Sequence, residues 1–333
     1  MRILIIALFV ISLMSCNKSE DNAITTKLDS IAMGTGYASD IYYSFKNGIV
    51  TTTPRNNWDL GFKTNPRSSS IIINSTLGLK LWQSPISDTA SWSTKLDTTG
   101  LKLSWKSLLD SDTTWSLSAF EANQTGHPNY GWGDYNQITH DVVGKAIFVI
   151  QLADKSYKKI WIKKRFAIGN TYSISYANLD GSSSVNATIK CSDYLTKNFV
   201  YYKISSGEII DREPVQADWD ILLTKYYEMV FNSATQAKEP YNVTGILQNE
   251  GVLAAEVNGD VASNSYSSAA FSTAFSVIGS DWKTLDMQTF VYTMKPEVKY
   301  FVQTKDKSIY KLVFKKFEGS STGKVVFEKT KLK

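Results

Sequence analysis

The sequence repeats one succession of structural signals. A tyrosine pair, a glycine turn, a proline and a Trp-Asp dipeptide leading into apolar residues occur in this order in residues 42–62, and again in residues 201–223. Two later segments, 154–164 and 306–316, also match, because each runs from Asp-Lys-Ser through apolar residues to Lys-Lys. Repetition of both an opening and a closing motif predicts two copies of one structural unit. The residues that carry the function are then expected at positions where the two copies differ.

Alternation of apolar and polar residues with a period of two dominates both copies, which predicts β-strands. The clearest predicted strands are residues 145–152, 159–163, 171–176, 300–303, 310–314 and 324–327. Clusters of Gly, Asn, Asp and Ser punctuate them as turns, and 13% aromatic residues supply broad apolar side chains for a sheet core. We therefore predict an all-β protein.

The repeat ends give the expected division of the chain. The first antiparallel β unit is predicted at residues 38–180 and the second at 197–333. Two tandem domains and one fused sandwich that shares a sheet both fit this pattern.

Residues 1–15 have the form of a bacterial lipoprotein signal peptide. Arg2 supplies a positive start, and residues 3–13 are an apolar segment too short to span a bilayer as a helix. The segment ends at Leu-Met-Ser before Cys16, which resembles a lipobox, so acylation of Cys16 is expected. We predict that residues 16–37 are a lipid anchor and tether. The acidic residues within 17–22 resemble a surface-export signal, which predicts display on the outer membrane.

Charge and cysteine content give few further constraints. Removal of Arg2 leaves 35 basic against 31 acidic residues, a net charge of about +4. The C-terminal lysines are interpreted as solubilising edge-strand residues rather than as a nucleic-acid or anionic-lipid patch. With Cys16 acylated, Cys191 has no cysteine partner, so no disulfide is expected.

No sequence pattern points to catalysis. There is no zinc-ligand spacing, phosphate-binding loop, Gly-x-Ser-x-Gly or dinucleotide-binding glycine motif. The repeated carboxylates Asp59 and Asp220 are possible acids or bases, but no partner histidine or second acid is repeated with them. We interpret them as acceptors for backbone N–H groups at a strand start. The chain is therefore predicted not to be an enzyme.

Three pieces of this sequence resemble the HmuY family, haem-scavenging lipoproteins of Bacteroidetes. The first is the aromatic hairpin that leads through a polar turn to Trp-Asp and an apolar strand. The second is the aromatic loop at residues 131–135, and the third is the C-terminal meander at residues 301–314. The resemblance implies an all-β, extracellular, lipid-anchored protein that takes haem from host proteins and passes it to an outer-membrane transporter.

The resemblance also implies paired axial side chains on the haem iron. The chain has two histidines, His127 and His140, and imidazole is a good haem-iron ligand, so these two residues are the candidate ligands. Tyr130, Trp132 and Tyr135 are candidates to stack on or hydrogen-bond the porphyrin. Neither histidine falls on a ligand position of the best-known relative.

Two further sets of residues accompany this prediction. Lys145 or Lys158 could pair with a haem propionate. In the second copy, the position matching His140 is expected near Tyr292, so Met287, Tyr292 and Met294 form the alternative ligand set.

The resulting prediction is a non-catalytic surface lipoprotein that binds haem. The alternative is a β scaffold without haem that presents loops to glycans or partner proteins, for which the nine tryptophans would suit sugar stacking. The expected partners are haem or haem-carrying host proteins and a transporter, with membrane contact through the anchor alone and no nucleic acid.

Overall fold

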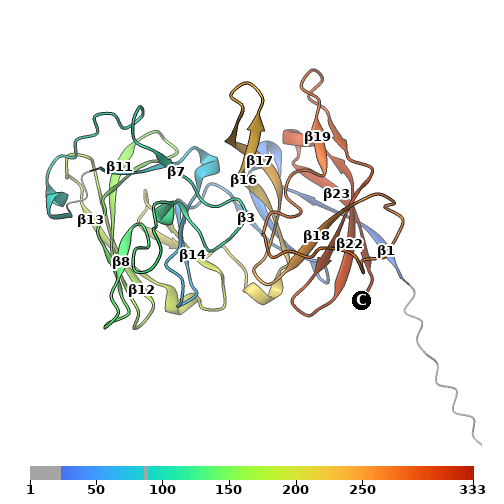
Figure 1. Ribbon diagram of the computed structural model, residues 1–333, viewed down its shortest axis with the longest axis horizontal. Helices are drawn as coiled ribbons and strands as arrows, with labels where there is room; N and C mark the ends of the chain where they lie inside the picture. The colour runs from blue at the N-terminus through green and yellow to red at the C-terminus, as the bar shows by residue number, and fades with distance from the viewer. Residues whose placement is uncertain (1–23, 86–88) are drawn as a thin grey trace, which may run out of the picture.

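The computed structural model describes residues 24–85 and 89–333, and it confirms the all-β fold class. The predicted signal peptide, Cys16 and the tether as far as residue 23 lie outside the described residues. Within the described ranges, no helix is long and apolar enough to cross a membrane. The strands form antiparallel sheets that make up two lobes side by side (Figure 1).

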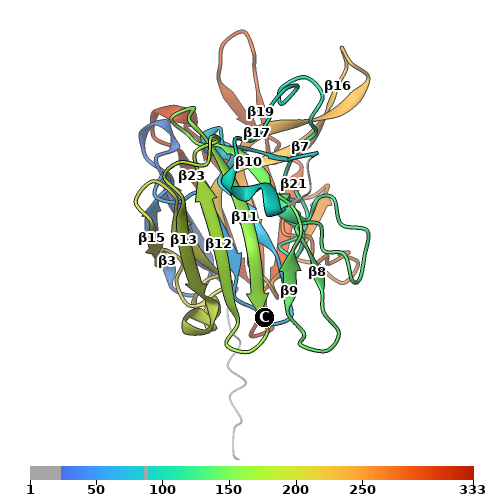
Figure 2. The same cartoon turned by 90° about the vertical axis from the view of Figure 1, so that its left-hand side faces the viewer.

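Lobe one consists of two facing sheets. The outer sheet has the strand order β13-β12-β11-β10-β6-β7, with β8 and β9 attached through β11; Figure 2 shows β13, β12 and β11 side by side. The inner sheet has the order β15-β14-β4-β5. The outer strands are β6 (Lys80–Gln83), β7 (Ser107–Leu108), β8 (Gly133–Tyr135), β9 (Val142–Gly144), β10 (Phe148–Gln151), β11 (Tyr157–Phe166), β12 (Thr171–Ala177) and β13 (Val185–Lys190). The inner strands are β4 (Leu60–Lys63), β5 (Ile71–Ile73), β14 (Phe199–Lys203) and β15 (Glu208–Ile210).

Lobe two repeats this arrangement. Its outer sheet has the order β1-β23-β22-β21-β18 and its inner sheet the order β17-β16-β2-β3, with β19 and β20 as a separate hairpin. The outer strands are β1 (Thr26–Ala32), β18 (Leu253–Asn258), β21 (Val298–Gln303), β22 (Ile309–Phe317) and β23 (Lys324–Lys331). The remaining strands are β2 (Ser39–Ser44), β3 (Gly48–Pro54), β16 (Ile221–Asn232), β17 (Ala237–Gln248), β19 (Lys283–Leu285) and β20 (Tyr292–Met294).

Short 3-10 helices connect the strands of both lobes. They are η1 (Thr35–Tyr37), η2 (Ser75–Leu77), η3 (Thr89–Ser93), η4 (Ala119–Glu121), η5 (Cys191–Tyr194), η6 (Gln216–Asp218) and η7 (Gly319–Ser321). The predicted strands of the two meanders correspond to β10, β11 and β12 in lobe one and to β21, β22 and β23 in lobe two. Cys191 is a free, fully buried thiol in the core of lobe one, and burial raises its pKa to about 12. Such a thiol is chemically inert at neutral pH.

The two inner sheets lie back to back and are buried on both faces. In β16, Ile221 and Leu223 face the core of lobe two, whereas Leu222 packs between the sheets with Tyr42. In β14, Tyr202 faces the core of lobe one, whereas Tyr201 packs between the sheets. Strands buried on both faces need apolar residues at every position. This explains the continuous apolar runs in the repeated motif.

Each inner sheet combines strands from both copies of the repeat. The β14–β15 hairpin, which belongs to the second copy, pairs with β4 of the first, and the β2–β3 hairpin of the first copy pairs with β16 of the second. Each lobe therefore takes strands from both 38–180 and 197–333. The two copies exchange their opening hairpins within one chain.

The repeated aspartates hold these exchanged hairpins. The Asp59 N–H donates to the carbonyl of Tyr202 at 2.9 Å, and its carboxylate accepts the N–H of Ile204 at 2.9 Å. In the second copy, the Asp220 N–H donates to the carbonyl of Tyr43 at 2.8 Å, and its carboxylate accepts the N–H of Phe45 at 2.8 Å. These contacts give both aspartates a structural role at a strand start.

We expect Asp59→Ala and Asp220→Ala each to lower the free energy of unfolding by roughly 2–3 kcal/mol, because each leaves a buried backbone N–H without an acceptor. Asp59→Ala should cost more, since the ammonium of Lys203, 2.9 Å from Asp59, also loses its partner. Urea unfolding measures both effects. Asp193→Ala, on an exposed side chain, is the control and should change stability by less than about 0.5 kcal/mol. Unchanged unfolding midpoints in both core variants would contradict the proposed role.

Candidate functional site

A cavity of about 560 Å³ opens on lobe one beside the β8–β9 hairpin. Its lining includes both histidines of the chain, His127 and His140, together with Tyr130 and Tyr135. The turn between β4 and β5 contributes residues 65–69. The structure therefore brings together four of the residues predicted to bind haem. We call this site the histidine cavity.

The β8–β9 turn fixes the position of His140. The side-chain oxygen of Asn136 accepts the N–H groups of Ile138 at 2.9 Å and Thr139 at 3.0 Å, and the N–H of His140 donates to the carbonyl of Asn136 at 2.8 Å. The φ angle of His140 is +61°, which is uncommon for a residue other than glycine. The side chain of Asn136 holds the turn that requires this conformation.

Both imidazoles contact a tyrosine hydroxyl through Nδ1. Nδ1 of His140 lies 2.5 Å from the hydroxyl of Tyr135, and Nδ1 of His127 lies 3.4 Å from the hydroxyl of Tyr130. The ring of Tyr135 is also 5.0 Å from the ring of His127, between ring centroids. In the part of the chain that the structure describes, no hydrogen bond reaches Nε2 of either histidine. Both Nε2 atoms are therefore free to bind a ligand.

Two arginines give the histidine cavity a positive wall. Arg165 is 5% exposed, and its Nη2 donates to the carbonyl of Pro66 and to the side chain of Asn170, whereas its buried Nε has no partner. Arg67 is exposed. Among the described residues, neither arginine forms an ion pair. A positive wall without ion-pair partners favours an anionic group on a ligand, such as a carboxylate.

Glu121 adds a weakly acidic group to the same cavity. Burial raises the pKa of its carboxyl, and the hydroxyls of Ser69 and Ser118 donate to it at 2.7 and 3.1 Å, which offsets part of that rise. Sequence reasoning missed Arg67 and Arg165 because they lie far from residues 127–140 along the chain; it missed Glu121, which lies close by, because no pattern in the sequence marked it.

The β19–β20 hairpin of lobe two is the counterpart of the β8–β9 hairpin. The carboxylate of Asp286 accepts the N–H groups of Gln288 at 2.8 Å and Thr289 at 3.0 Å, as Asn136 does in lobe one. Phe290 then adopts φ +56°, so Phe290 occupies the place of His140. This corrects the expectation that Tyr292 matches His140; in the same register, Tyr292 matches Val142.

Lobe two is filled where lobe one is hollow. A β-bulge lies at the same place in β11 and β22, which aligns Arg165 with Phe317. Arg165 and Val142 line the histidine cavity, whereas Phe317 and Tyr292 pack edge to face, with ring centroids 4.8 Å apart. The ring of Tyr37 stacks on Phe317 at 6.2 Å.

The other predicted residues lie elsewhere. Trp132 is fully buried in the core of lobe one, where its indole N–H donates to the carbonyl of Ser69 at 3.1 Å. Lys145 forms an exposed ion pair with Asp134 at 2.6 Å, and neither Lys145 nor Lys158 lines the cavity. The alternative ligands are also spread out. Met287 is 68% exposed at a hairpin tip, whereas Met294 packs on the core of lobe two.

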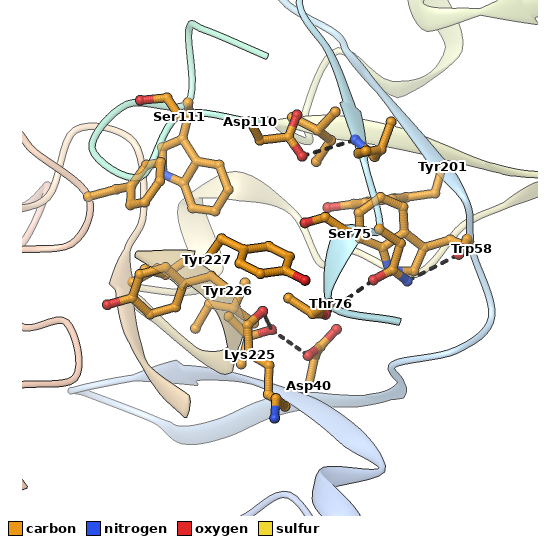
Figure 3. Close-up of a pocket in the computed structure, with 18 of the residues that line it drawn as sticks. Asp40, Trp58, Ser75, Thr76, Asp110, Ser111, Tyr201, Lys225, Tyr226 and Tyr227 are labelled. Carbon is orange, nitrogen blue, oxygen red and sulfur yellow. Dashed lines mark hydrogen bonds between the residues drawn. The ribbon is translucent and has the colours of Figure 1, made fainter. Parts of the chain in front are cut away.

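A second pocket, of about 100 Å³, lies between the two inner sheets (Figure 3). Beside it, the guanidinium of Arg212 pairs with Asp40 at 2.6 Å, and both side chains are buried. The carboxyl of Asp110 also lines this pocket and accepts the N–H groups of Ala119 at 2.8 Å and Ile73 at 3.1 Å. Burial nevertheless raises the pKa of Asp110 to about 7.

Fold and site together define an all-β protein with one histidine–tyrosine cavity. No family model and no curated protein matches the chain. Among solved structures, the chain is similar to the crystal structure of apo PinO from Porphyromonas gingivitis, with 10% sequence identity over 93% of this chain and 98% of that chain. The TM-score of 0.28 is too low to support an argument about fold detail or function.

We expect the stability of the protein to fall as the pH rises from about 4 to about 7. Burial raises the pKa of Asp110 and of Glu213 to about 7, whereas both carboxyls ionise near pH 4 in the unfolded chain. The folded state therefore binds more protons in this window, and the free energy of unfolding decreases with pH. In Asp110→Asn, the decrease in the free energy of unfolding over this pH range should be smaller by about 3 kcal/mol.

Urea unfolding at about pH 5 and about pH 7 measures this slope. Asp193→Asn, on an exposed side chain, is the matched control and should leave the slope unchanged. A slope in Asp110→Asn equal to that of the unmodified protein would show that Asp110 is ionised in the folded state.

Proposed function

We propose that this chain is a non-catalytic, lipid-anchored surface protein that binds haem in the histidine cavity. One observation carries the proposal: the two histidines of the sequence line a single cavity, and each directs Nδ1 to a tyrosine hydroxyl. The proposal also draws on the resemblance to HmuY-type haem scavengers in the hairpin, loop and meander motifs.

The chemistry of these side chains fits haem as cargo. A histidine that binds a metal through one ring nitrogen usually holds an oxygen partner with the other, which orients the ring. Tyr135 and Tyr130 would supply that oxygen to His140 and His127, so Nε2 of each imidazole would be the iron ligand. Arg165, whose side chain lines the cavity, would pair with a haem propionate in place of the predicted Lys145 or Lys158.

The size of the cavity is compatible with such a ligand. Small-molecule and cofactor sites commonly enclose about 300–1,000 Å³, and the histidine cavity, at about 560 Å³, falls in that range. A bound haem supplies a Lewis-acidic iron for the imidazoles. The chain's own part is to hold the ligand, orient it and place aromatic rings against it.

The difference between the lobes supports one site per chain. Lobe two carries Leu285 and Phe290 where lobe one carries Tyr135 and His140, and its corresponding interior is filled by aromatic rings. A ligand site confined to lobe one requires the two copies of the scaffold to differ at these positions, and they do.

Hand-over to a transporter requires a surface for a partner protein. The β16–β17 and β19–β20 hairpins project from the same side of lobe two (Figures 1 and 2). Their tips expose large apolar side chains, a feature of protein interaction sites. These side chains are Met229, Val230, Phe231, Tyr241, Met287, Phe290 and Val291. We assign the transporter contact to these tips.

Titration with hemin tests the proposed function. We expect a saturable Soret band for the purified protein, and at least about tenfold weaker binding in His127→Ala and in His140→Ala, because each loses an iron ligand. Tyr135→Phe should weaken binding without abolishing it, since it removes only the hydroxyl that orients His140. Absorbance at the Soret maximum against hemin concentration gives each affinity.

Lobe two provides matched controls. Phe290→Ala changes the counterpart of His140 and should leave hemin affinity unchanged, as should Met287→Ala. The double variant Val142→Tyr/Arg165→Phe introduces the residues that fill lobe two, and it should abolish binding with both histidines intact. Full binding in both histidine variants would move the site to Met287, Tyr292 and Met294. Absence of any Soret change would refute haem binding.

The anchor has its own test. Expressed in a bacterial host, the protein should partition with membranes and carry a diacylglyceryl mass on an N-terminal peptide beginning at Cys16, because the lipobox thiol is the acylated atom. Cys16→Ala should be soluble and lack this mass. A processed N-terminus without lipid in the unmodified protein would refute the anchor and leave the haem proposal unaffected.

A further inference from the structure

The pocket between the two inner sheets, which we call the interlobe pocket, has strongly aromatic walls. Trp58 and Tyr201 come from lobe one, whereas Tyr226 and Tyr227 come from β16 of lobe two. Trp115 lies on the segment that crosses between the lobes, and its ring packs 4.5 Å from that of Phe275, between centroids. The pocket therefore presents flat apolar faces from both lobes.

Segment 110–119 holds these walls in place. The indole N–H of Trp115 donates to the carbonyl of Gln248 at 2.9 Å, and the N–H of Phe275 donates to the carbonyl of Thr113 at 2.9 Å. The ring of Trp115 contributes to all three apolar clusters between the inner sheets. The pocket is therefore preorganised by contacts that involve both lobes.

Hydrogen-bonding groups lie among the aromatic rings. Figure 3 shows the side chains of Asp110, Ser75 and Tyr227 around the same gap. Trp58 is 9% exposed, and its indole N–H is buried with no hydrogen-bond partner. The hydroxyls of Ser75 and Tyr227 can each donate and accept a hydrogen bond. The pocket thus offers both donors and acceptors to a ligand.

The charges beside the pocket are already matched. Asp40 accepts from Arg212 at 2.6 Å and from the hydroxyl of Thr224 at 2.6 Å, so its carboxylate is fully engaged. Both oxygens of Asp110 accept backbone N–H groups. Lys225 also lines the pocket, but its ammonium lies 5.0 Å from the ring centroid of Tyr37, a residue outside the lining. A charged ligand would therefore lose hydration without finding an unpaired counter-charge in the pocket.

We infer that the interlobe pocket binds one neutral sugar ring, such as the terminal hexose of a glycan. Aromatic faces would stack on the C–H face of the ring, and its hydroxyls would bond with Ser75, Tyr227 and Asp110. This site is separate from the histidine cavity and does not depend on the proposed haem binding.

The size of the pocket selects among ligands. A volume of about 100 Å³ is too small for a porphyrin and admits only a single small ring of a larger ligand. A purely apolar ligand would leave the hydroxyls that line the pocket unpaired. A sugar ring combines the small size, neutral charge and mixed hydrogen-bonding groups that the pocket requires.

Saturation-transfer NMR with the intact protein tests this inference, with methyl glycosides of glucose, galactose, mannose and N-acetylglucosamine as probes. We expect at least one probe to bind saturably, with a dissociation constant of about 1–10 mM. Tyr227→Ala should weaken binding at least about tenfold. Trp58→Phe keeps an aromatic ring but reduces its area in the pocket lining, so it should also weaken binding.

The repeat supplies the matched control. Trp219 occupies the place of Trp58 in the second copy and its indole N–H is also buried without a partner, but it does not line the interlobe pocket. Trp219→Phe should therefore leave sugar binding unchanged, and His140→Ala should do the same. Hemin affinity should be unchanged in Trp58→Phe, which separates this site from the haem site.

Three results would overturn the inference. The first is that no glycoside gives a saturable signal. The second is that Trp219→Phe weakens binding as much as Trp58→Phe, which would indicate a general structural effect. The third is that toluene binds saturably and no glycoside competes with it, which would identify the pocket as a site for apolar ligands.

Discussion

The exchange of hairpins between the two copies is the constraint on which the rest of the structure depends. Because β14 pairs with β4 and β2 pairs with β16, each inner sheet exists only when both halves of the chain are present. Asp59 and Asp220 fasten the exchanged hairpins through backbone N–H groups. The interlobe pocket then lies between the two back-to-back inner sheets. The turn between β4 and β5 forms part of the histidine cavity.

Local patterns in the sequence were sufficient for the fold class and not for the strand partners. Alternation marks β10 to β12 and β21 to β23, and the repeat marks Asp59 and Asp220 as equivalent. The partner of β14 is not encoded locally, because Tyr43 and Tyr202 are equivalent residues and either hairpin could satisfy either aspartate. A continuous apolar run such as residues 221–223 shows burial on both faces. It does not show which sheet covers the second face.

The residues of the candidate site were also predicted only in part from the sequence. His127, Tyr130, Tyr135 and His140 were found because they lie on neighbouring turns, so proximity in sequence gives proximity in space. Trp132 lies among them but faces the core, since a large indole in a β-protein is stabilised most by burial. Arg67 comes from the turn between β4 and β5 and Arg165 from β11, both distant in sequence. A signal for Arg165 was present in the sequence, because its counterpart in the repeat is Phe317.

The comparison between the lobes shows how a duplicated scaffold can accommodate a ligand cavity. Replacement of a buried aromatic cluster by Val142, Arg165 and open space removes apolar contacts, which destabilises lobe one relative to a filled core. Lobe two keeps its cluster of Tyr37, Tyr292 and Phe317, and the exchanged hairpins couple its stability to that of lobe one. A cavity that would weaken an isolated unit is therefore tolerated in one lobe, because the other lobe fills the matching position with aromatic rings and the two lobes exchange strands of their inner sheets.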